Sequence, residues 1–489
     1  NSQHTIMHYR AIIRILGLLV ALFSVTMIPP AIVSLIYEDG SGLPFFLAFI
    51  LCILTGCAFW YPNRSHRQDL RAREGFLIVV LFWSVLASFG AIPFILLEQP
   101  SMTVTDAFFE SFSGLTTTGA TVIEGIDFLP HSVQFYRQQL QWLGGMGIIV
   151  LAVAILPILG VGGMQLYRAE TPGPVKDSKM TPRIADTAKH LWYIYLSLTT
   201  ACTLAYWFAG MNWFDAICHS FSTIAIGGFS THDASLGYFD SPVVNAICAL
   251  FLIIAAFNFS LHYAAASGRT LKGYWQDPEL KAFLFIQAAL ISVCFIVLVF
   301  HNHFSDAEEA LDQAVIQAVS ISTTAGFATT DFANWPSFLP ILLIFSSFIG
   351  GCAGSTGGGL KVIRVYLLFL QGKREIDRLI HPKAVYSVKL GERAMPDRVV
   401  EAVWGFFSAY AIVFVVIMIG LIATGLDNIT AFTATAATLN NLGPGLGSVA
   451  GTFADVSDGG KWLLVTAMLF GRLEVFSLLV LFSPTFWRG

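Results

Sequence analysis

Four glycines are the residues of this sequence whose spacing points to chemistry. When Ala107, Ala216, Ala314 and Ala431 are aligned, a glycine follows twelve positions later in each case, as Gly119, Gly228, Gly326 and Gly443. They belong to four similar segments rich in Ser, Thr, Ala and Gly, at residues 106–121, 215–231, 312–329 and 430–445. A helix of about 11 residues reaches only about 16 Å, half the thickness of a bilayer. In a chain as apolar as this one, each segment is predicted to enter a membrane and turn back.

A ring of backbone oxygens is the chemistry that four such turns could perform. Irregular backbone at mid-bilayer is costly unless it is buried in protein or lines a water-filled path. Four turns around one axis would supply carbonyl oxygens that replace the hydration shell of a cation. Glycine suits such a turn because it accepts a positive φ. The predicted ligands are the carbonyl groups directly before the glycines: Thr117 and Thr118, Ile226 and Gly227, Thr324 and Ala325, Asn441 and Leu442.

Short helices are expected to lead into the four turns from the outer side. Asp106, Asp215 and Asp312 are expected near their positive N-terminal ends. The partially negative C-terminal ends would then point at the midplane and favour a cation there. The alternative is that the segments are packing helices of small residues, which are common at transmembrane interfaces. The same register in four segments favours the ring.

A glycine-rich run interrupts the apolar stretch that follows the third segment. It consists of Gly350, Gly351, Cys352, Ala353, Gly354, Ser355, Thr356, Gly357, Gly358 and Gly359. Because glycine costs about 1 kcal/mol per residue in a helix relative to alanine, the run is predicted to form a loop below the ring, across the route to the cytosol. It does not match the phosphate-binding pattern G-x-x-x-x-G-K-[ST], and no predicted strand precedes it.

The last apolar stretch carries an arginine at its centre. Arg472 costs several kcal/mol there unless it is paired or faces a polar cavity. Glu474, two residues on, points to a different helix face, so an intrahelical pair is not expected. The free carbonyl groups of the glycine-rich run, or polar groups opposite, are the expected partners of Arg472. The alternative is a structural arginine that extends to the cytoplasmic interface. Lys361 and Arg364 are interpreted as ordinary residues of the cytoplasmic side.

Two further polar residues lie within the short helices. Glu110 either contributes negative potential near the ring or forms local hydrogen bonds, and the sequence does not choose between the two. His219 is interpreted as a packed polar residue rather than a metal ligand.

The composition places these residues in an all-α polytopic membrane protein. Charged residues make up 12% of the 489 residues and hydrophobic ones 55%, against about 25% charged in soluble chains. This composition excludes a soluble enzyme, a disulfide scaffold and a nucleic-acid-binding domain. Ten crossings are predicted from apolar stretches long enough to span a bilayer, at 12–37, 44–61, 75–97, 138–159, 190–209, 242–266, 281–301, 336–371 (interrupted), 401–424 and 460–482.

The basic residues predict how the chain is oriented. Segments 62–74, 160–189, 267–282 and 361–400 hold 21 of the 27 Lys and Arg residues. They alternate with acidic segments that carry almost none. By the positive-inside rule, the basic side and both termini are expected to face the cytoplasm. The basic stretch 361–400 could also receive a cytosolic partner, although most charge runs are merely solvated.

The four glycine segments, the glycine-rich run, the arginine of the last span and two extra N-terminal spans resemble the Trk/Ktr/HKT superfamily of potassium transporters, and within it the bacterial Trk-type uptake subunits. The resemblance covers Met7 to Gly489. It implies four span–pore helix–span repeats around a pseudo-fourfold pore, like a fused tetrameric channel. It also implies K⁺ or Rb⁺ as the preferred ion. Family members with Ser in place of the first-repeat glycine lean towards Na⁺, whereas this sequence has Gly119 there. The run 350–359 would be an intramembrane gate that acts with Arg472.

The resemblance also implies the organisation and the partners of the chain. Family members are typically homodimers in the bacterial inner membrane, and Trk-type members bind a cytosolic RCK-type gating subunit (TrkA-like) that responds to NAD and ATP or ADP. No cofactor is expected in this chain, and K⁺ would be its transported ion. The expected divisions are 1–6 (a remnant of cloning), 7–74 (two N-terminal helices), and four pore repeats at 75–166, 167–270, 271–395 and 396–489.

Two other functions are weighed against a gated pore. A secondary transporter that couples K⁺ to H⁺ or Na⁺ would need intramembrane acids, of which Glu110 and Glu474 are the few candidates, and inverted repeats, whereas these repeats share one orientation. A membrane-embedded enzyme is not expected, because no H-E-x-x-H motif, Walker motif or Ser/His/Asp set is recognisable.

Overall fold

The computed structural model describes residues 7–66, 72–150 and 180–488. The predicted remnant of cloning, 1–6, and the end of the predicted crossing 138–159 lie outside these ranges. The described chain is helical, with one two-stranded antiparallel hairpin of β1 (Lys389–Leu390) and β2 (Arg393–Ala394). The predicted all-α fold is confirmed.

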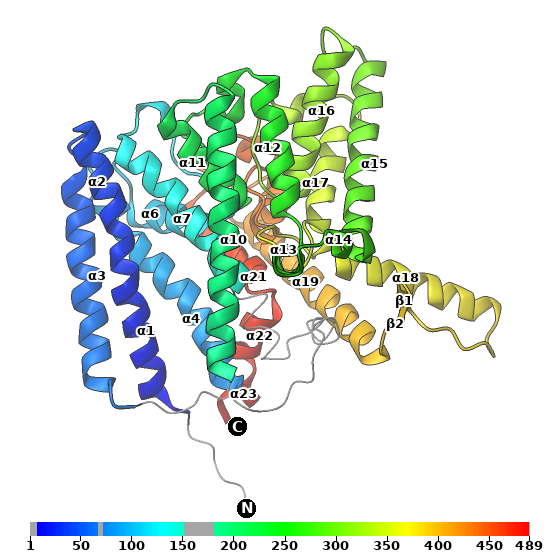
Figure 1. Cartoon of the computed structure of the whole chain (residues 1–489), viewed down its shortest axis with the longest axis horizontal. Helices are drawn as coiled ribbons and strands as arrows, with labels where there is room; N and C mark the ends of the chain where they lie inside the picture. The colour runs from blue at the N-terminus through cyan, green and yellow to red at the C-terminus, as the bar shows by residue number, and fades with distance from the viewer. Residues whose placement is uncertain (1–6, 67–71, 151–179, 489) are drawn as a thin grey trace, which may run out of the picture.

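The N-terminal unit is a closely packed pair of helices (Figure 1). It consists of α1 (Tyr9–Ser24), η1 (Val25–Met27), α2 (Ile28–Tyr37) and α3 (Gly42–Asn63). Gly17 of α1 and Gly56 of α3 allow the two backbones to touch, because a Cβ on Gly56 would lie 2.5 Å from the backbone nitrogen of Ala21. The two extra N-terminal spans predicted at 12–37 and 44–61 are therefore present as a hairpin.

The first two repeats each place a short helix between two longer ones. The first contains α4 (Ala72–Gly90), α5 (Ile92–Leu96), α6 (Val104–Leu115), η2 (Ile126–Phe128) and α7 (His131–Val150). The second contains α10 (Met180–Phe208), α11 (Trp213–Ile224), η4 (Ser235–Phe239), α12 (Pro242–Ala255) and α13 (Phe259–Gly268).

The continuous crossing predicted at 242–266 is wrong, because α12 and α13 meet at an angle of 86°. The Asn258 side chain caps α13 by accepting a hydrogen bond from the Ser260 amide at 2.9 Å. The break releases the Ala256 carbonyl, which accepts a hydrogen bond from the Cys352 amide at 3.0 Å. The second repeat thus bends where the glycine-rich run meets it.

The last two repeats again place a helix between two others, with additional short elements before or after them. The third contains α14 (Lys272–Gln276), α15 (Pro278–Phe300), α16 (Ala307–Ser322), η5 (Phe332–Asn334), α17 (Leu339–Ile349) and α18 (Val362–Ile380). The fourth contains α19 (Asp397–Ala423), α20 (Asn428–Leu439), η6 (Gly447–Val449), α21 (Asp458–Arg472), α22 (Phe476–Phe482) and α23 (Pro484–Arg488). As predicted, the stretch 336–371 is interrupted, between α17 and α18.

The continuous crossing predicted at 460–482 is also wrong. Helices α21 and α22 meet at 115°, and Glu474 and Val475 between them have φ of 52° and 56°. The bend separates Arg472 from Glu474, and each then bonds to a different part of the molecule.

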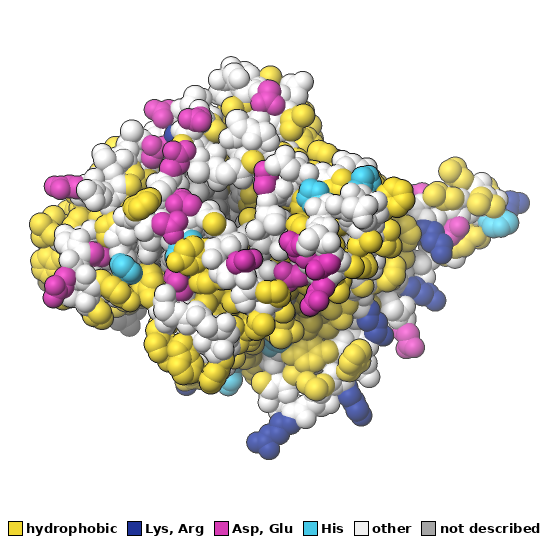
Figure 2. All heavy atoms as spheres, turned by 90° about the horizontal axis from the view of Figure 1, so that it is seen from above, with side chains coloured by type: hydrophobic (Ala, Val, Ile, Leu, Met, Phe, Trp, Pro, Cys, Tyr) yellow, Lys and Arg dark blue, Asp and Glu magenta, His cyan; other side chains and the backbone are white. Residues whose placement is uncertain are grey.

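Within the described ranges, five helices are long and apolar enough to span a membrane, or seven if each bent pair counts as one span. Each predicted crossing coincides with a described helix or broken helix, apart from the undescribed end of 138–159. Helices α11 and α16 lie towards the upper end of the molecule in Figure 1, whereas the start of α1 and α23 lie at the lower end and α18 protrudes sideways. Seen from above, acidic side chains are spread over the face, and Lys and Arg gather at its edge (Figure 2).

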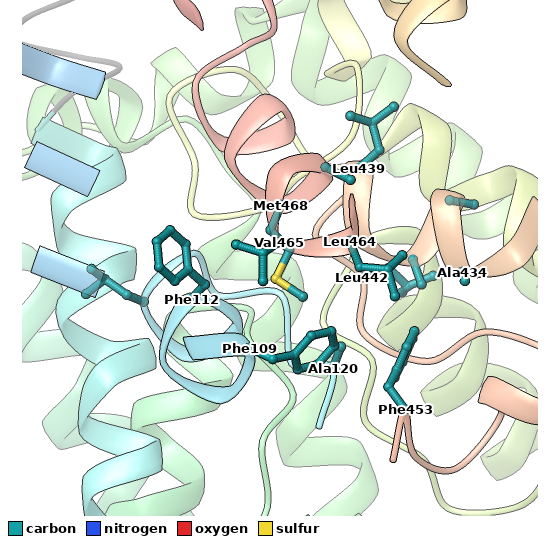
Figure 3. Packing of buried hydrophobic residues seen from close by; sticks show 14 of the residues in the cluster. Phe109, Phe112, Ala120, Ala434, Leu439, Leu442, Phe453, Leu464, Val465 and Met468 are labelled. Atoms are coloured by element: carbon teal, nitrogen blue, oxygen red, sulfur yellow. The ribbon is translucent and has the colours of Figure 1, made fainter. Parts of the chain in front are cut away.

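The first and fourth repeats pack against each other through a buried apolar cluster. Figure 3 shows Phe109 and Phe112 of α6 beside Leu464 and Met468 of α21. The Phe109 ring lies 5.6 Å from that of Phe453, centroid to centroid. In a membrane, such contacts stabilise helix association through van der Waals packing. This cluster joins repeats more than 300 residues apart in sequence, so the four repeats close on themselves.

Candidate cation site and the loop beneath it

The four short helices begin with the same capping arrangement. The N-cap side chains Thr103, Asn212, Asp306 and Asp427 each accept a hydrogen bond from a backbone amide three residues further on, which satisfies one of the free amides at the helix start. Asp106 and Asp215 lie in the first turn, as predicted. The prediction for Asp312 is wrong, because α16 begins earlier, at Ala307, in a run of good helix formers. Asp312 instead accepts a hydrogen bond from Asn245 at 2.8 Å.

The four helices also end in the same backbone turn. The residue two positions before each glycine has a positive φ, and so does the glycine itself: Thr117 52° and Gly119 83°, Ile226 52° and Gly228 79°, Thr324 71° and Gly326 85°, Asn441 55° and Gly443 99°. The amide between them returns to the helix, as in the 2.9 Å hydrogen bond from Thr118 to the Ser113 carbonyl and the 2.7 Å bond from Leu442 to that of Ala437. The turns thereby use their N–H groups internally and leave carbonyl groups for other partners.

The four turns face one another in a closed cycle. A Cβ on Gly119 would lie closer than 3.0 Å to the carbonyl oxygen of Gly227, and the same holds for Gly228 with Ala325, Gly326 with Leu442, and Gly443 with Thr118. Each glycine therefore lies against the carbonyl group of the next repeat, and the fourth repeat returns to the first. The arrangement forms a ring of carbonyl groups, which we name the glycine ring. It brings together all twelve residues singled out in the four turns.

The glycine-rich run 350–359 lies directly beneath the glycine ring and bonds to three of its repeats. The Thr356 hydroxyl donates to the Ile224 carbonyl at 2.9 Å. The Gly358 amide donates to the Thr324 hydroxyl at 2.7 Å, and the Gly359 amide to the Asn440 carbonyl at 3.1 Å. The run therefore contacts the C-terminal ends of α11, α16 and α20.

Arg472 completes these contacts at the first repeat. Its Nε donates to the Thr116 carbonyl at 2.7 Å, its Nη1 to the Thr356 carbonyl at 3.4 Å, and its Nη2 to the Thr117 hydroxyl. The expected bonding of Arg472 to a carbonyl group of the run is thus present. Arg472 is 4% exposed, so it does not extend to the interface. A cationic side chain and a backbone loop together lie under all four turns.

The run is held by partners that sequence reasoning did not identify. Glu279, near the start of α15, accepts hydrogen bonds from the amides of Ala353 at 2.7 Å and Ile363 at 3.1 Å. The Phe259 amide at the start of α13 donates to the Gly354 carbonyl at 3.0 Å. Glu279 therefore ties the tip of the run to the beginning of α18.

The interpretation of Lys361 and Arg364 as ordinary cytoplasmic-side residues is wrong, because both are buried. Lys361 donates to the Gly357 carbonyl. Arg364 donates to Glu474 at 2.6 Å and lies 4.2 Å from the Phe406 ring centroid. The sequence feature that indicates the Arg364–Glu474 pair is Glu474 itself. It is an intramembrane acid with no basic residue on its own helix face, so it requires a partner elsewhere.

Glu110 of α6 is buried and forms an ion pair and two hydrogen bonds. It pairs with Arg137 of α7 at 2.9 Å, with exposed fractions of 0% and 1%, and accepts hydrogen bonds from the Thr121 hydroxyl and the Val122 amide. Arg137 also donates to the Ser230 carbonyl at 3.1 Å. Of the two open roles, local hydrogen bonding is the one that the structure shows.

We expect Glu110→Gln to lower the free energy of unfolding by about 3 kcal/mol, because removing one partner of a buried ion pair leaves the other charge uncompensated. Glu124→Gln, at an exposed position in the same repeat, is the control. Unfolding in mixed detergent would measure both variants. Equal stability of the two variants would mean that Arg137 finds sufficient partners elsewhere.

His219 uses both ring nitrogens in hydrogen bonds, with the Asp215 carbonyl and the Ser230 hydroxyl, each at 2.8 Å. This agrees with the interpretation of a packed polar residue. Across the described ranges, no group of three His, Cys, Asp or Glu side chains could hold a metal ion.

His232 joins two carboxylates near the start of α11. Its nitrogens lie 2.5 Å from Asp127 and 3.2 Å from Asp215, and its ring stacks on Tyr238 with His219 nearby. Burial lowers the pKa of His232, but the hydrogen bonds and charges of Asp215 and Asp127 outweigh it and raise the pKa above its ordinary value.

The raised pKa of His232 predicts a pH-dependent contribution to stability. That contribution is fully present below the ordinary pKa of about 6.5 and is lost as pH rises through the folded-state value. We therefore expect the melting temperature to fall between mildly acidic and alkaline pH by a component that His232→Gln removes. His301→Gln, at an exposed histidine, should retain it. A pH profile unchanged by His232→Gln would contradict the prediction.

Comparison with known proteins agrees with this architecture. Residues 41–488 match the TrkH family model, described as a cation transport protein. The Trk system potassium uptake protein TrkH of Vibrio parahaemolyticus is 66% identical over 99% of this chain and all of the relative. The TrkH protein of Escherichia coli K12 is 65% identical over the same share. The crystal structure of the potassium transporter TrkH from Vibrio parahaemolyticus superimposes with a TM-score of 0.93 at 64% identity, covering 98% of this chain and 100% of that one. The chain belongs to the TrkH family of cation transport proteins.

Proposed function

We propose that this protein takes up K⁺ through a gated, channel-like pore whose selectivity filter is the glycine ring. The observation that carries the proposal is the closed cycle in which each ring glycine lies against a carbonyl group of the next repeat. The similar proteins are named potassium uptake proteins, which supports K⁺ as the transported ion. The proposed filter residues are Thr117, Thr118, Gly119, Ile226, Gly227, Gly228, Thr324, Ala325, Gly326, Asn441, Leu442 and Gly443.

In this mechanism the filter carbonyl groups replace the hydration shell of K⁺. The pore helices direct their partially negative C-terminal ends at the ring, which favours a cation and disfavours an anion. The amide groups of the turns donate to their own helices, so they do not compete with the ion for the carbonyl oxygens.

The proposed gate is the run 350–359 together with Arg472. The run crosses beneath the ring, and Arg472 adds a positive charge that repels a cation leaving the filter. For ions to pass, the hydrogen bonds from Thr356, Gly358 and Arg472 to the pore-helix ends must break or rearrange. The buried Arg364–Glu474 pair links α18 to the bend between α21 and α22, so movement of α18 would be transmitted through this bend to Arg472.

Regulation, assembly and orientation belong to the same proposal. A homodimer in the bacterial inner membrane, with both termini cytoplasmic, would present the basic segment 361–400 to a cytosolic RCK-type nucleotide-binding subunit. The name "Trk system" of the relatives supports an assembly of several components. The repeat boundaries at 75, 167, 271 and 396 stay a prediction.

The experiment that tests the function is a reversal-potential measurement on the purified protein in a planar bilayer. We expect the reversal potential to follow the K⁺ gradient alone when the pH and Na⁺ gradients are varied. A potential that shifts with either gradient would indicate transport coupled to H⁺ or Na⁺, and an absence of K⁺ current with or without the cytosolic partner would overturn the proposal.

A further inference from the structure

The four repeats differ at the position directly before the filter glycine. Thr118, Ala325 and Leu442 carry a side chain there, whereas Gly227 in the second repeat carries none. A Cβ on Gly227 would lie closer than 3.0 Å to the side-chain amide of Gln141 from α7. Gln141 is fully buried. Its amide therefore occupies the space that a side chain at position 227 would need.

The Gln141 amide forms two hydrogen bonds that span the filter glycine of the second repeat. Its Nε2 donates to the Gly227 carbonyl at 2.8 Å, and the Phe229 amide donates to its Oε1 at 3.0 Å. This orientation follows from the network, because the flipped amide would set two acceptors and two donors face to face. The side chain thus pairs with the turn in the way that a neighbouring strand would.

This pairing makes the glycine ring asymmetric. Among the four equivalent carbonyl groups, the hydrogen bonds of the described chain include a side-chain donor for Gly227 and none for Thr118, Ala325 or Leu442. A donor fixes the position of the Gly227 oxygen and draws on its electron density. Discrimination between cations depends on the spacing and the field strength of such oxygens.

We propose that Gln141 is a positioning residue that increases K⁺ over Na⁺ selectivity. It does so by fixing the backbone on both sides of Gly228 in the second-repeat turn. Gln141 acts through the Gly227 carbonyl and the Phe229 amide. The inference rests on the proposed function, since it assigns a role within the same filter. Because α7 belongs to the first repeat, the two hydrogen bonds of Gln141 also hold the first and second repeats at a fixed separation.

The test compares Gln141→Met with Gln139→Met in liposomes or planar bilayers under bi-ionic K⁺ and Na⁺. Methionine keeps the length and volume of glutamine but cannot form either hydrogen bond. Gln139 is a matched control, because it is buried on the same helix and donates instead to the Thr26 carbonyl of the N-terminal unit at 2.8 Å. We expect Gln141→Met to raise the Na⁺-to-K⁺ permeability ratio by about three- to tenfold, and Gln139→Met to leave it unchanged. The ratio does not depend on how much protein is folded.

A second set of variants keeps the inference testable if Gln141→Met does not fold. Gln141→Asn retains the amide on a shorter stem and is expected to give an intermediate ratio. Gly227→Ala should impair selectivity by displacing Gln141, and combining it with Gln141→Ala should impair it less than the product of the single effects, because the clash is removed. If the wild type prefers K⁺ but Gln141 variants keep its ratio, the inference is overturned. If the wild type itself shows no preference, the proposed filter fails instead.

Discussion

An alanine in place of Gly228 is expected to reduce the K⁺-over-Na⁺ permeability ratio by at least about tenfold. Its Cβ would lie closer than 3.0 Å to the Ala325 carbonyl oxygen of the next repeat, a backbone atom that cannot rotate away as a side chain could. The turn also has a φ of 79° at this glycine, where an L-residue is strained. To relieve the overlap, the second and third repeats must move apart, which widens the ring. Bi-ionic reversal potentials would measure the change.

Gly210→Ala is the matched control for this variant. Gly210 precedes α11 of the same repeat and has a φ of 109°, but nothing lies within 4 Å of an added Cβ. Gly210→Ala therefore strains the backbone but causes no steric overlap with another repeat. The K⁺-over-Na⁺ selectivity of this variant should remain that of the wild type. Selectivity retained in Gly228→Ala as well would show that the contact between the glycine and the neighbouring carbonyl is not where ions are distinguished.

The ring was predictable from the sequence because it is made of backbone. A turn that requires a positive φ constrains the residue type at Gly119, Gly228, Gly326 and Gly443, and a fourfold repeat shows that constraint four times in one register. The glycine-rich run could be predicted for the same reason, because six glycines in ten positions are incompatible with a stable helix.

The side chains that hold the ring and the run were not predictable in this way. Arg364 and Glu474 are 110 residues apart, and Gln141 lies 86 residues from Gly227, so no local pattern connects them. The bend between α21 and α22 depends on partners that Arg472 and Glu474 find in other repeats. The apolar stretch 460–482 has the normal length of a membrane span, so a continuous helix was expected there. Asp312 does not lie in a first turn because the good helix formers upstream of it extend α16 back to Ala307, which the repeat alignment does not reflect.

Removing the tip of the glycine-rich run is expected to increase basal K⁺ flux by at least about tenfold. The two ends of the run already meet: the Leu360 amide donates to the Phe348 carbonyl at 2.8 Å, and a Cβ on Gly357 would lie 3.4 Å from the Cα of Gly351. Deleting residues 352–356 can therefore join Gly351 to Gly357 without pulling α17 and α18 apart. The deletion removes the hydrogen bonds to Ile224, Ala256, Phe259 and Glu279. The part of the run that lies beneath the second repeat is then absent.

Thr356→Val tests the same closure with a smaller change. Valine has nearly the volume of threonine but cannot donate to the Ile224 carbonyl, so basal flux is expected to rise about threefold. Thr466→Val, at an exposed threonine that bonds only within its own helix, should have no effect. Rubidium uptake into liposomes, normalised to folded protein by size-exclusion chromatography, measures all three variants. If the deletion variant folds and shows ordinary or lower flux, the run does not hold the pathway shut, and the charge of Arg472 beneath the first repeat would have to account for closure by itself.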